Sequence, residues 1–116
     1  MKYKKYNLQD VYDASAQNKF NVISTFAGGG GSSTGYRLAG GKILCINEFV
    51  QEARNTYAEN YPDTPILPDD IKELTGQDLL DAAGIKAGEV DILDGSPPCS
   101  AFSMAGAVVQ GGGHTK

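Results

Sequence analysis

A run of four glycines between two hydrophobic segments is the first feature of this 116-residue sequence that could bind a ligand. The run, Gly28–Gly31, follows a β-branched stretch and precedes Ser32-Ser33-Thr34, whose hydroxyls are suited to capping the start of a helix. Glycine lets backbone amides approach a ligand closely, and a helix start leaves N–H groups unpaired. No lysine follows, and GxGxxG is not met in its usual register, so triphosphate binding is disfavoured and the dinucleotide motif is incomplete.

Glu48 ends the next hydrophobic run, 20 positions after Gly28. In open α/β sheets that bind a nucleotide, an acidic residue at this place holds the hydroxyl pair of a ribose. The glycine turn and Glu48 together favour an adenosine-containing ligand. They leave NAD, FAD and S-adenosylmethionine open.

Cys99 follows Pro97 and Pro98, which fix the backbone ahead of it and remove two N–H donors. A stiff turn at the end of a predicted strand favours an exposed thiol, and Cys99 is therefore a candidate nucleophile. Cys45 lies inside a predicted strand and is interpreted as a small buried hydrophobe. With two cysteines and one histidine, the chain offers neither a disulfide framework nor a zinc site, and we expect no metal.

Strands and helices alternate in the predicted order, which indicates a parallel sheet and an α/β fold. The predicted strands are 21–26, 42–48 and 90–94, with a further short one at 66–67, and the predicted helices are 8–16, 32–39, 50–60 and 77–83. So few strands predict a partial Rossmann-like sheet, the first half of such a domain, since a typical sheet has about five or six. We divide the chain into a polar leader (1–19), a catalytic part (20–105) and a flexible glycine-rich tail (106–116).

Composition limits the class of protein. Ten Lys and Arg against 14 Asp and Glu give a net charge of −4, which argues against binding nucleic acid through a bulk basic surface. Hydrophobic residues at 41% and charged residues at 21% are typical of a globular chain. No segment approaches the ~18 apolar residues of a membrane span, and the basic N-terminal tip has no apolar run behind it. We expect a cytoplasmic protein without membrane contact.

Four blocks, in order, resemble motifs of the DNA cytosine-5 methyltransferases. Phe26–Gly31 resembles the family's FxGxGG motif, which wraps the methionine part of S-adenosylmethionine. Asn47-Glu48-Phe49 and Asp70-Ile71 are similar to the second and third motifs, which hold the ribose and the adenine. Ser96–Ser103 resembles the catalytic block, PCxxFS in outline.

The resemblance implies a role for each matching residue. Glu48 would hold the ribose, Phe49 would pack on adenine, and Asp70 would accept from the adenine amino group. The cofactor, S-adenosylmethionine, would be bound by Phe26, Ala27, Gly28, Gly29, Gly30, Gly31, Glu48, Phe49, Asp70, Ile71 and Pro98. The substrate implied is cytosine in DNA, bound by the complete enzyme.

The implied mechanism is covalent. The Cys99 thiolate would add to carbon 6 of a cytosine flipped out of the duplex, and carbon 5 would then accept the methyl group. Loss of the carbon-5 proton and release of the thiol would end the cycle. Because a free thiol has a pKa near 8.5, the site must lower it or couple deprotonation to attack.

Several family elements are missing downstream of Cys99. The family's Glu-Asn-Val block has no counterpart there, since Glu59-Asn60-Tyr61 lies upstream, and Lys116 is the only cation that follows. The DNA-recognition region and the last cofactor motif are missing too. We therefore expect an N-terminal fragment that is inactive alone.

Two alternatives stay open at this point. The chain could be a non-catalytic module that binds S-adenosylmethionine or assembles with another chain, since its last strand would form an exposed edge that invites pairing or self-association. A nicotinamide-dependent oxidoreductase would fit the glycine turn and Glu48, but it leaves the segment 97–103 without a role.

Overall fold

A parallel sheet with helices on both faces is the framework of the molecule, which a computed structural model describes over residues 5–95. The strands are β1 (Phe20–Thr25), β2 (Gly41–Asn47), β3 (Ile66–Leu67) and β4 (Ile92–Gly95). Their order in the sheet is β3-β2-β1-β4, and every neighbouring pair is parallel. The predicted α/β fold, a partial Rossmann-like sheet, is confirmed, and so is the short strand at 66–67.

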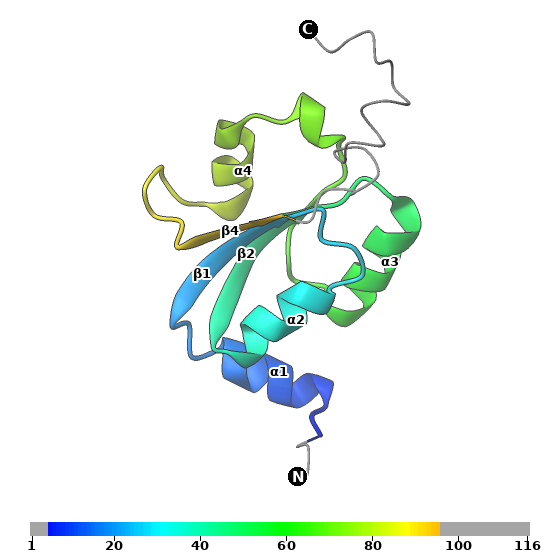
Figure 1. The fold of residues 1–116 in the computed structure, drawn as a ribbon, viewed down its shortest axis with the longest axis vertical. Helices are drawn as coiled ribbons and strands as arrows, with labels where there is room; N and C mark the ends of the chain where they lie inside the picture. The colour runs from blue at the N-terminus through cyan, green and yellow to red at the C-terminus, as the bar shows by residue number, and fades with distance from the viewer. Residues whose placement is uncertain (1–4, 96–116) are drawn as a thin grey trace, which may run out of the picture.

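Four α-helices connect and cover these strands within residues 5–95. They are α1 (Leu8–Ser15), α2 (Gly31–Leu38), α3 (Gln51–Asn60) and α4 (Gly76–Ala83), with a short 3-10 helix, η1, at Ile71–Glu73. Helix α4 lies on one side of the sheet, and the other helices lie on the opposite side (Figure 1). Each predicted helix is present to within about two residues, the usual uncertainty of a helix end.

Local side-chain chemistry explains where two of these helices begin. Asn7 and Asp10 form a reciprocal capping box at the start of α1, with N–H to oxygen distances of 2.9 and 3.0 Å. Thr75 and Asp78 do the same at the start of α4. Such pairs satisfy N–H groups that the first helical turn leaves without partners. Gly84, in the left-handed conformation, ends α4.

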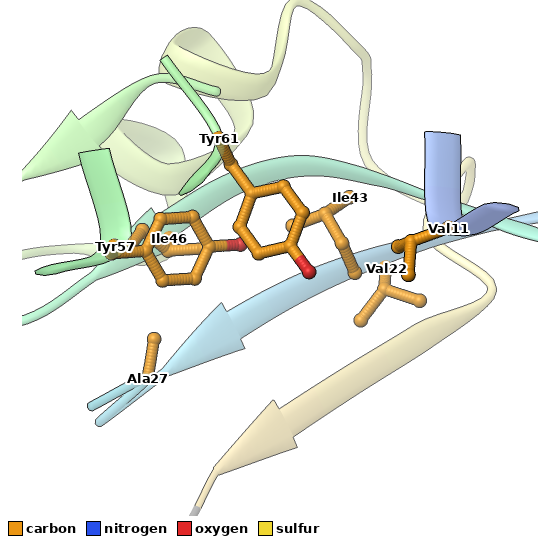
Figure 2. Packing of buried hydrophobic residues seen from close by; sticks show 7 residues of the cluster. All are labelled: Val11, Val22, Ala27, Ile43, Ile46, Tyr57 and Tyr61. Carbon is orange, nitrogen blue, oxygen red and sulfur yellow. The ribbon is translucent and has the colours of Figure 1, made fainter. Parts of the chain in front are cut away.

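The main hydrophobic core lies between the sheet and the three helices α1, α2 and α3. Side chains from the two central strands meet Tyr57 of α3 and Tyr61, the residue that caps the end of α3 (Figure 2). The buried members are Val11, Val22, Ala27, Ile43, Ile46, Tyr57 and Tyr61. On the opposite face of the sheet, Ile23 and Cys45 are buried, and the Cys45 sulfur lies 3.6 Å from the Leu79 carbonyl oxygen of α4.

Helix α1 belongs to this core, a point that the sequence left open for residues 1–19. Val11 is 1% exposed and packs within the core cluster. The Ser15 hydroxyl donates to the Gly41 carbonyl at 2.7 Å, and the Lys19 N–H donates to the Gly40 carbonyl at 2.8 Å. The described part of the polar leader is therefore packed on the sheet, while the tail 106–116 lies outside the described residues.

Arg37 is a charged side chain within the core, only 4% exposed. Its guanidinium carbon lies 3.6 Å from the centre of the Tyr61 ring, which is a close cation–π contact. Its nitrogens donate to the hydroxyls of Tyr57 at 3.0 Å and Thr64 at 2.8 Å. Arg37 thereby ties the end of α2 to α3 and to the segment that follows α3.

We predict that Gly41→Ala destabilises the fold and that Gly35→Ala does not. A Cβ at Gly41 would lie no more than 3.0 Å from three atoms of the Phe20 ring, whereas a Cβ at Gly35 would meet nothing within 4 Å. The free energy of unfolding should fall by about 1–3 kcal/mol for Gly41→Ala. It should rise by about 0.5–1 kcal/mol for Gly35→Ala, because alanine is the better helix former. Urea unfolding followed by far-UV circular dichroism measures both, and equal effects would contradict the packing described at these two glycines.

Candidate functional site

The glycine turn joins β1 to α2 at the carboxyl edge of the sheet. Phe26, Gly28 and Gly30 have φ angles of 51°, 61° and 105°, all in the left-handed region. The Ala27 N–H donates to the Asn47 carbonyl of β2 at 3.1 Å, which holds the turn against the neighbouring strand. This path strains the backbone at Phe26, because a residue with a Cβ rarely adopts a positive φ.

The glycines of this turn have different neighbours. A Cβ at Gly30 would lie 3.2 Å from the Tyr57 ring and 3.3 Å from the Tyr61 ring, in addition to the strained φ. A Cβ at Gly28 or Gly31 would meet nothing within 4 Å. The turn is therefore closed at Gly30 against Tyr57 of α3 and the capping residue Tyr61, and it is open at the other two positions.

Glu48 connects the glycine turn to the start of α3. One oxygen of its carboxylate accepts from the Gly28 N–H at 2.7 Å, and the other accepts from the Val50 N–H at 3.0 Å. The structure thus brings together the first two predicted motif blocks, which are 20 residues apart. An ionised carboxylate has about four acceptor positions, so two remain for a ligand.

Phe49 and Val50 form an exposed apolar surface beside Glu48, with 64% and 51% of their side chains accessible. The Arg54 guanidinium donates to the carbonyls of Glu48 and Phe49, which fixes the backbone of this short connection. An exposed aromatic ring on a fixed backbone offers a flat face to another planar ring.

Asn47 places the third predicted block, Asp70-Ile71. Its buried amide donates to the Leu67 carbonyl at 3.0 Å and to the Asp69 carbonyl at 2.8 Å, so the chain after β3 stays beside the end of β2. The Asp70 carboxylate accepts from the Lys72 N–H at 3.0 Å and caps η1. Sequence reasoning quoted Asn47 within a motif but gave it no role. The feature that could have indicated this role is an amide side chain at the end of a buried apolar strand.

Asp94 is a residue that sequence reasoning missed altogether. Its carboxylate accepts from the hydroxyls of Ser24 and Ser32 at 3.1 Å each, and from the hydroxyl of Tyr36 at 3.3 Å. Desolvation of its hydroxyl is the main effect that raises the pKa of Tyr36, and the negative charge of the nearby Asp94 raises this pKa further. One feature of the sequence could have pointed to Asp94: Ser24 is a polar residue within an apolar strand. The structure buries Ser24 completely.

Two predicted site residues, Pro98 and Cys99, lie outside the described residues. Between residues 5 and 95, no helix is long and apolar enough to cross a membrane. The same part of the chain contains no group of three or more His, Cys, Asp or Glu side chains that could hold a metal ion.

Comparison with known families identifies the chain. The sequence model of the C-5 cytosine-specific DNA methylases matches residues 20–115, which include all the predicted site residues. The chain belongs to this family. For this methylase chain, the oxidoreductase alternative is set aside, because the same match includes both the glycine turn and the segment 97–103.

Individual relatives of the methylase chain are type II methyltransferases. It is 40% identical over 85 residues to M.AquIA of Picosynechococcus sp., an alignment that covers 73% of this chain and 34% of the relative. It is 37% identical over 85 residues to M.AgeI of Thalassovita gelatinovora, covering 73% of this chain and 20% of the relative. It is 38% identical over 86 residues to M1.HphI of Haemophilus parahaemolyticus, covering 74% and 23%. The methylase chain thus matches between 20% and 34% of the length of these curated relatives.

We predict that Cys45 is chemically silent in the folded methylase chain. Burial raises the pKa of its thiol to about 11. Iodoacetamide at pH 8 should therefore leave Cys45 unmodified in the native chain and modify it in urea, as peptide mass spectrometry would show. Rapid native labelling would contradict its placement under α4.

The raised pKa of Cys45 also predicts a pH dependence of stability. Because the folded pKa exceeds the unfolded value, the neutral thiol contributes stability that is fully present below about pH 8.5 and is lost as the pH rises towards 11. The free energy of unfolding should fall more steeply between pH 9 and 11 in the natural chain than in Cys45→Ala, by roughly 1–2 kcal/mol over the range. Parallel slopes from urea titrations would contradict this.

Proposed function

We propose that this chain is the N-terminal part of a DNA cytosine-5 methyltransferase, the part that binds S-adenosylmethionine and carries the nucleophile. The observation that carries the proposal is the 2.7 Å hydrogen bond from the Gly28 N–H to the Glu48 carboxylate. It joins two motif blocks of the family at the carboxyl edge of a parallel sheet, where open α/β folds bind nucleotides. Type II names among the relatives support a role in restriction and modification.

The residues at this edge fit the proposed cofactor. Glu48 retains acceptor positions for the two ribose hydroxyls, and the exposed Phe49 offers its ring to adenine. Asp70 would accept from the adenine amino group, with Ile71 beside it, and Pro98 would approach through its backbone. The turn from Phe26 and Ala27 through Gly31 would enclose the methionine part, on the side where Gly28 and Gly31 leave open space. When bound, the cofactor supplies an electrophilic methyl group.

The proposed chemistry depends on Cys99. Its thiolate would add to carbon 6 of a flipped-out cytosine, and the displaced electrons would make carbon 5 nucleophilic. Carbon 5 would then take the methyl group, whose bond to the sulfonium breaks so that a neutral thioether leaves. Removal of the proton from carbon 5 then expels the thiolate and restores the aromatic ring. This role rests on the family match and on the sequence around Cys99.

DNA contacts are assigned to the rest of the enzyme. The net charge of −4 supplies little of the phosphate attraction that DNA binding requires. A cytoplasmic location fits an enzyme that acts on DNA. The outer edge of β4, unpaired within residues 5–95, would pair with a further strand of the same enzyme or of another copy.

Calorimetric titration of the chain with S-adenosylmethionine tests the binding role. We expect saturable binding that Glu48→Ala weakens by about tenfold or more, because charge-assisted hydrogen bonds are lost. Glu52→Ala, which removes an exposed carboxylate of α3, is the matched control and should bind as the natural chain does. Binding of NAD in place of S-adenosylmethionine would overturn the proposal.

A second experiment tests the expected inactivity of the isolated chain. We expect no transfer of radiolabelled methyl groups to DNA above the level of a Cys99→Ser control, because the family's Glu-Asn-Val block and DNA-recognition region do not occur in these 116 residues. Transfer that depends on Cys99 would contradict the prediction and show that the chain contains a complete catalytic site.

A further inference from the structure

Strand β4 directly precedes the segment that carries Cys99. It has four residues, and it pairs with β1 from Val22↔Ile92 to Thr25↔Gly95. Within residues 5–95 it lies at the edge of the sheet, so main-chain hydrogen bonds hold it on one side. Cys99 follows the end of this strand by four residues. The direction in which the chain leaves β4 therefore matters for where the nucleophile lies.

Side chains reinforce the end of β4 through Asp94. Its carboxylate accepts three hydroxyl hydrogen bonds, from Ser24 of β1 and from Ser32 and Tyr36 of α2. We name these four residues the Asp94 clamp. Its donors come from the elements immediately before and after the glycine turn. One carboxylate thus fixes the end of β4, the strand that precedes the Cys99 segment, to both sides of the glycine turn.

The backbone after Asp94 is held as well. The Thr25 hydroxyl donates to the Asp94 carbonyl at 3.1 Å. A Cβ at Gly95 would lie only 2.8 Å from that same hydroxyl oxygen, so this close contact needs a glycine. Side-chain and main-chain contacts therefore act at the same point of β4.

The chemistry of the clamp requires a carboxylate. An ionised aspartate only accepts hydrogen bonds, and it has room for three hydroxyl donors. Hydrogen bonds to a charged acceptor are roughly twice as strong as neutral ones. An asparagine would keep one acceptor oxygen and turn the other group into a donor. Asp94 is thus matched to its three hydroxyl neighbours.

A second side-chain contact, between Asp91 and Asn21, provides a comparison for the Asp94 clamp. At the amino end of the same strand pair, the Asp91 carboxylate accepts from the Asn21 N–H at 2.9 Å, and the Asn21 side-chain oxygen accepts from the Asp91 N–H at 2.7 Å. This pair also holds β4 to β1. It lies at the opposite end of β1 from the glycine turn.

We propose that Asp94 is a positioning residue, which couples the cofactor-binding glycine turn to the segment that carries Cys99. The inference rests on the proposed function and deepens it. When a ligand orders the turn and the start of α2, Ser32 and Tyr36 transmit that order to Asp94, and Asp94 sets the end of β4. Binding at the turn then changes the surroundings of the Cys99 thiol.

The rate of alkylation of Cys99 by iodoacetamide, with and without saturating S-adenosylmethionine, tests this coupling in the full 116-residue chain. Buried Cys45 stays silent, and the modified peptide identifies the site. We expect the bound cofactor to slow alkylation of Cys99 by about fivefold, a coupling of ordinary size between two sites. In Asp94→Ala the rate should be the same with and without saturating cofactor.

Control variants separate positioning from stability. Asp91→Ala should keep the fivefold effect even if the chain is less stable, and Asp94→Asn should restore part of it. If Asp94→Ala does not fold, Ser32→Ala combined with Tyr36→Phe removes two of the three donors and should reduce the effect to less than about twofold. Thermal unfolding of each variant reports stability separately.

The outcomes separate this inference from the proposed function. Absence of S-adenosylmethionine binding to the natural chain would overturn the proposed function and the coupling with it. Binding without any change at Cys99, or an effect that survives in Asp94→Ala, would overturn the coupling and leave the proposed function standing. Equal loss in Asp91→Ala and Asp94→Ala would also overturn it, because the role would then be structural only.

Discussion

The carboxylate of Glu48 is the contact on which the candidate site depends. Parallel pairing brings the ends of β1 and β2 to the same edge of the sheet, and Glu48 then joins them through the Gly28 N–H at 2.7 Å. The same side chain accepts from the Val50 N–H at the start of α3. Helix α3 in turn supplies Tyr57, whose ring would lie only 3.2 Å from a Cβ at Gly30. Strand ends, glycine turn and helix thus form one connected unit.

Two charged side chains, Arg37 and Asp94, connect helix α2 to its neighbours in this fold. Arg37 is buried against Tyr57 and Tyr61 and donates to two hydroxyls, so its charge is balanced by aromatic faces and neutral acceptors. Removing one partner of such a group is costly, because it leaves a buried donor unsatisfied. The Asp94 clamp carries the opposite sign of charge and lies at a half-buried position. Both groups connect α2 to the elements around it.

Local sequence patterns were sufficient to predict most of the elements but few of the contacts between them. Strand 90–94 and the two-residue strand at 66–67 could be predicted because apolar runs and prolines act over short distances. The capping residues Thr75 and Asp78 act locally too. By contrast, Ser32 and Asp94 are 62 residues apart, and Asn47 bonds to a carbonyl 22 residues away. Hydroxyl and amide groups fit many partners, so only the folded chain selects one.

Phe26 carries a consequence for how this chain tolerates change. Glycine adopts its φ of 51° without strain, whereas a residue with a Cβ is strained there by roughly 1 kcal/mol or more. A chain under selection for stability alone would replace this phenylalanine with glycine. Phe26 therefore marks a position where the identity of the side chain outweighs the backbone strain. Sequence drift should be slow there even though the ring is only half-buried.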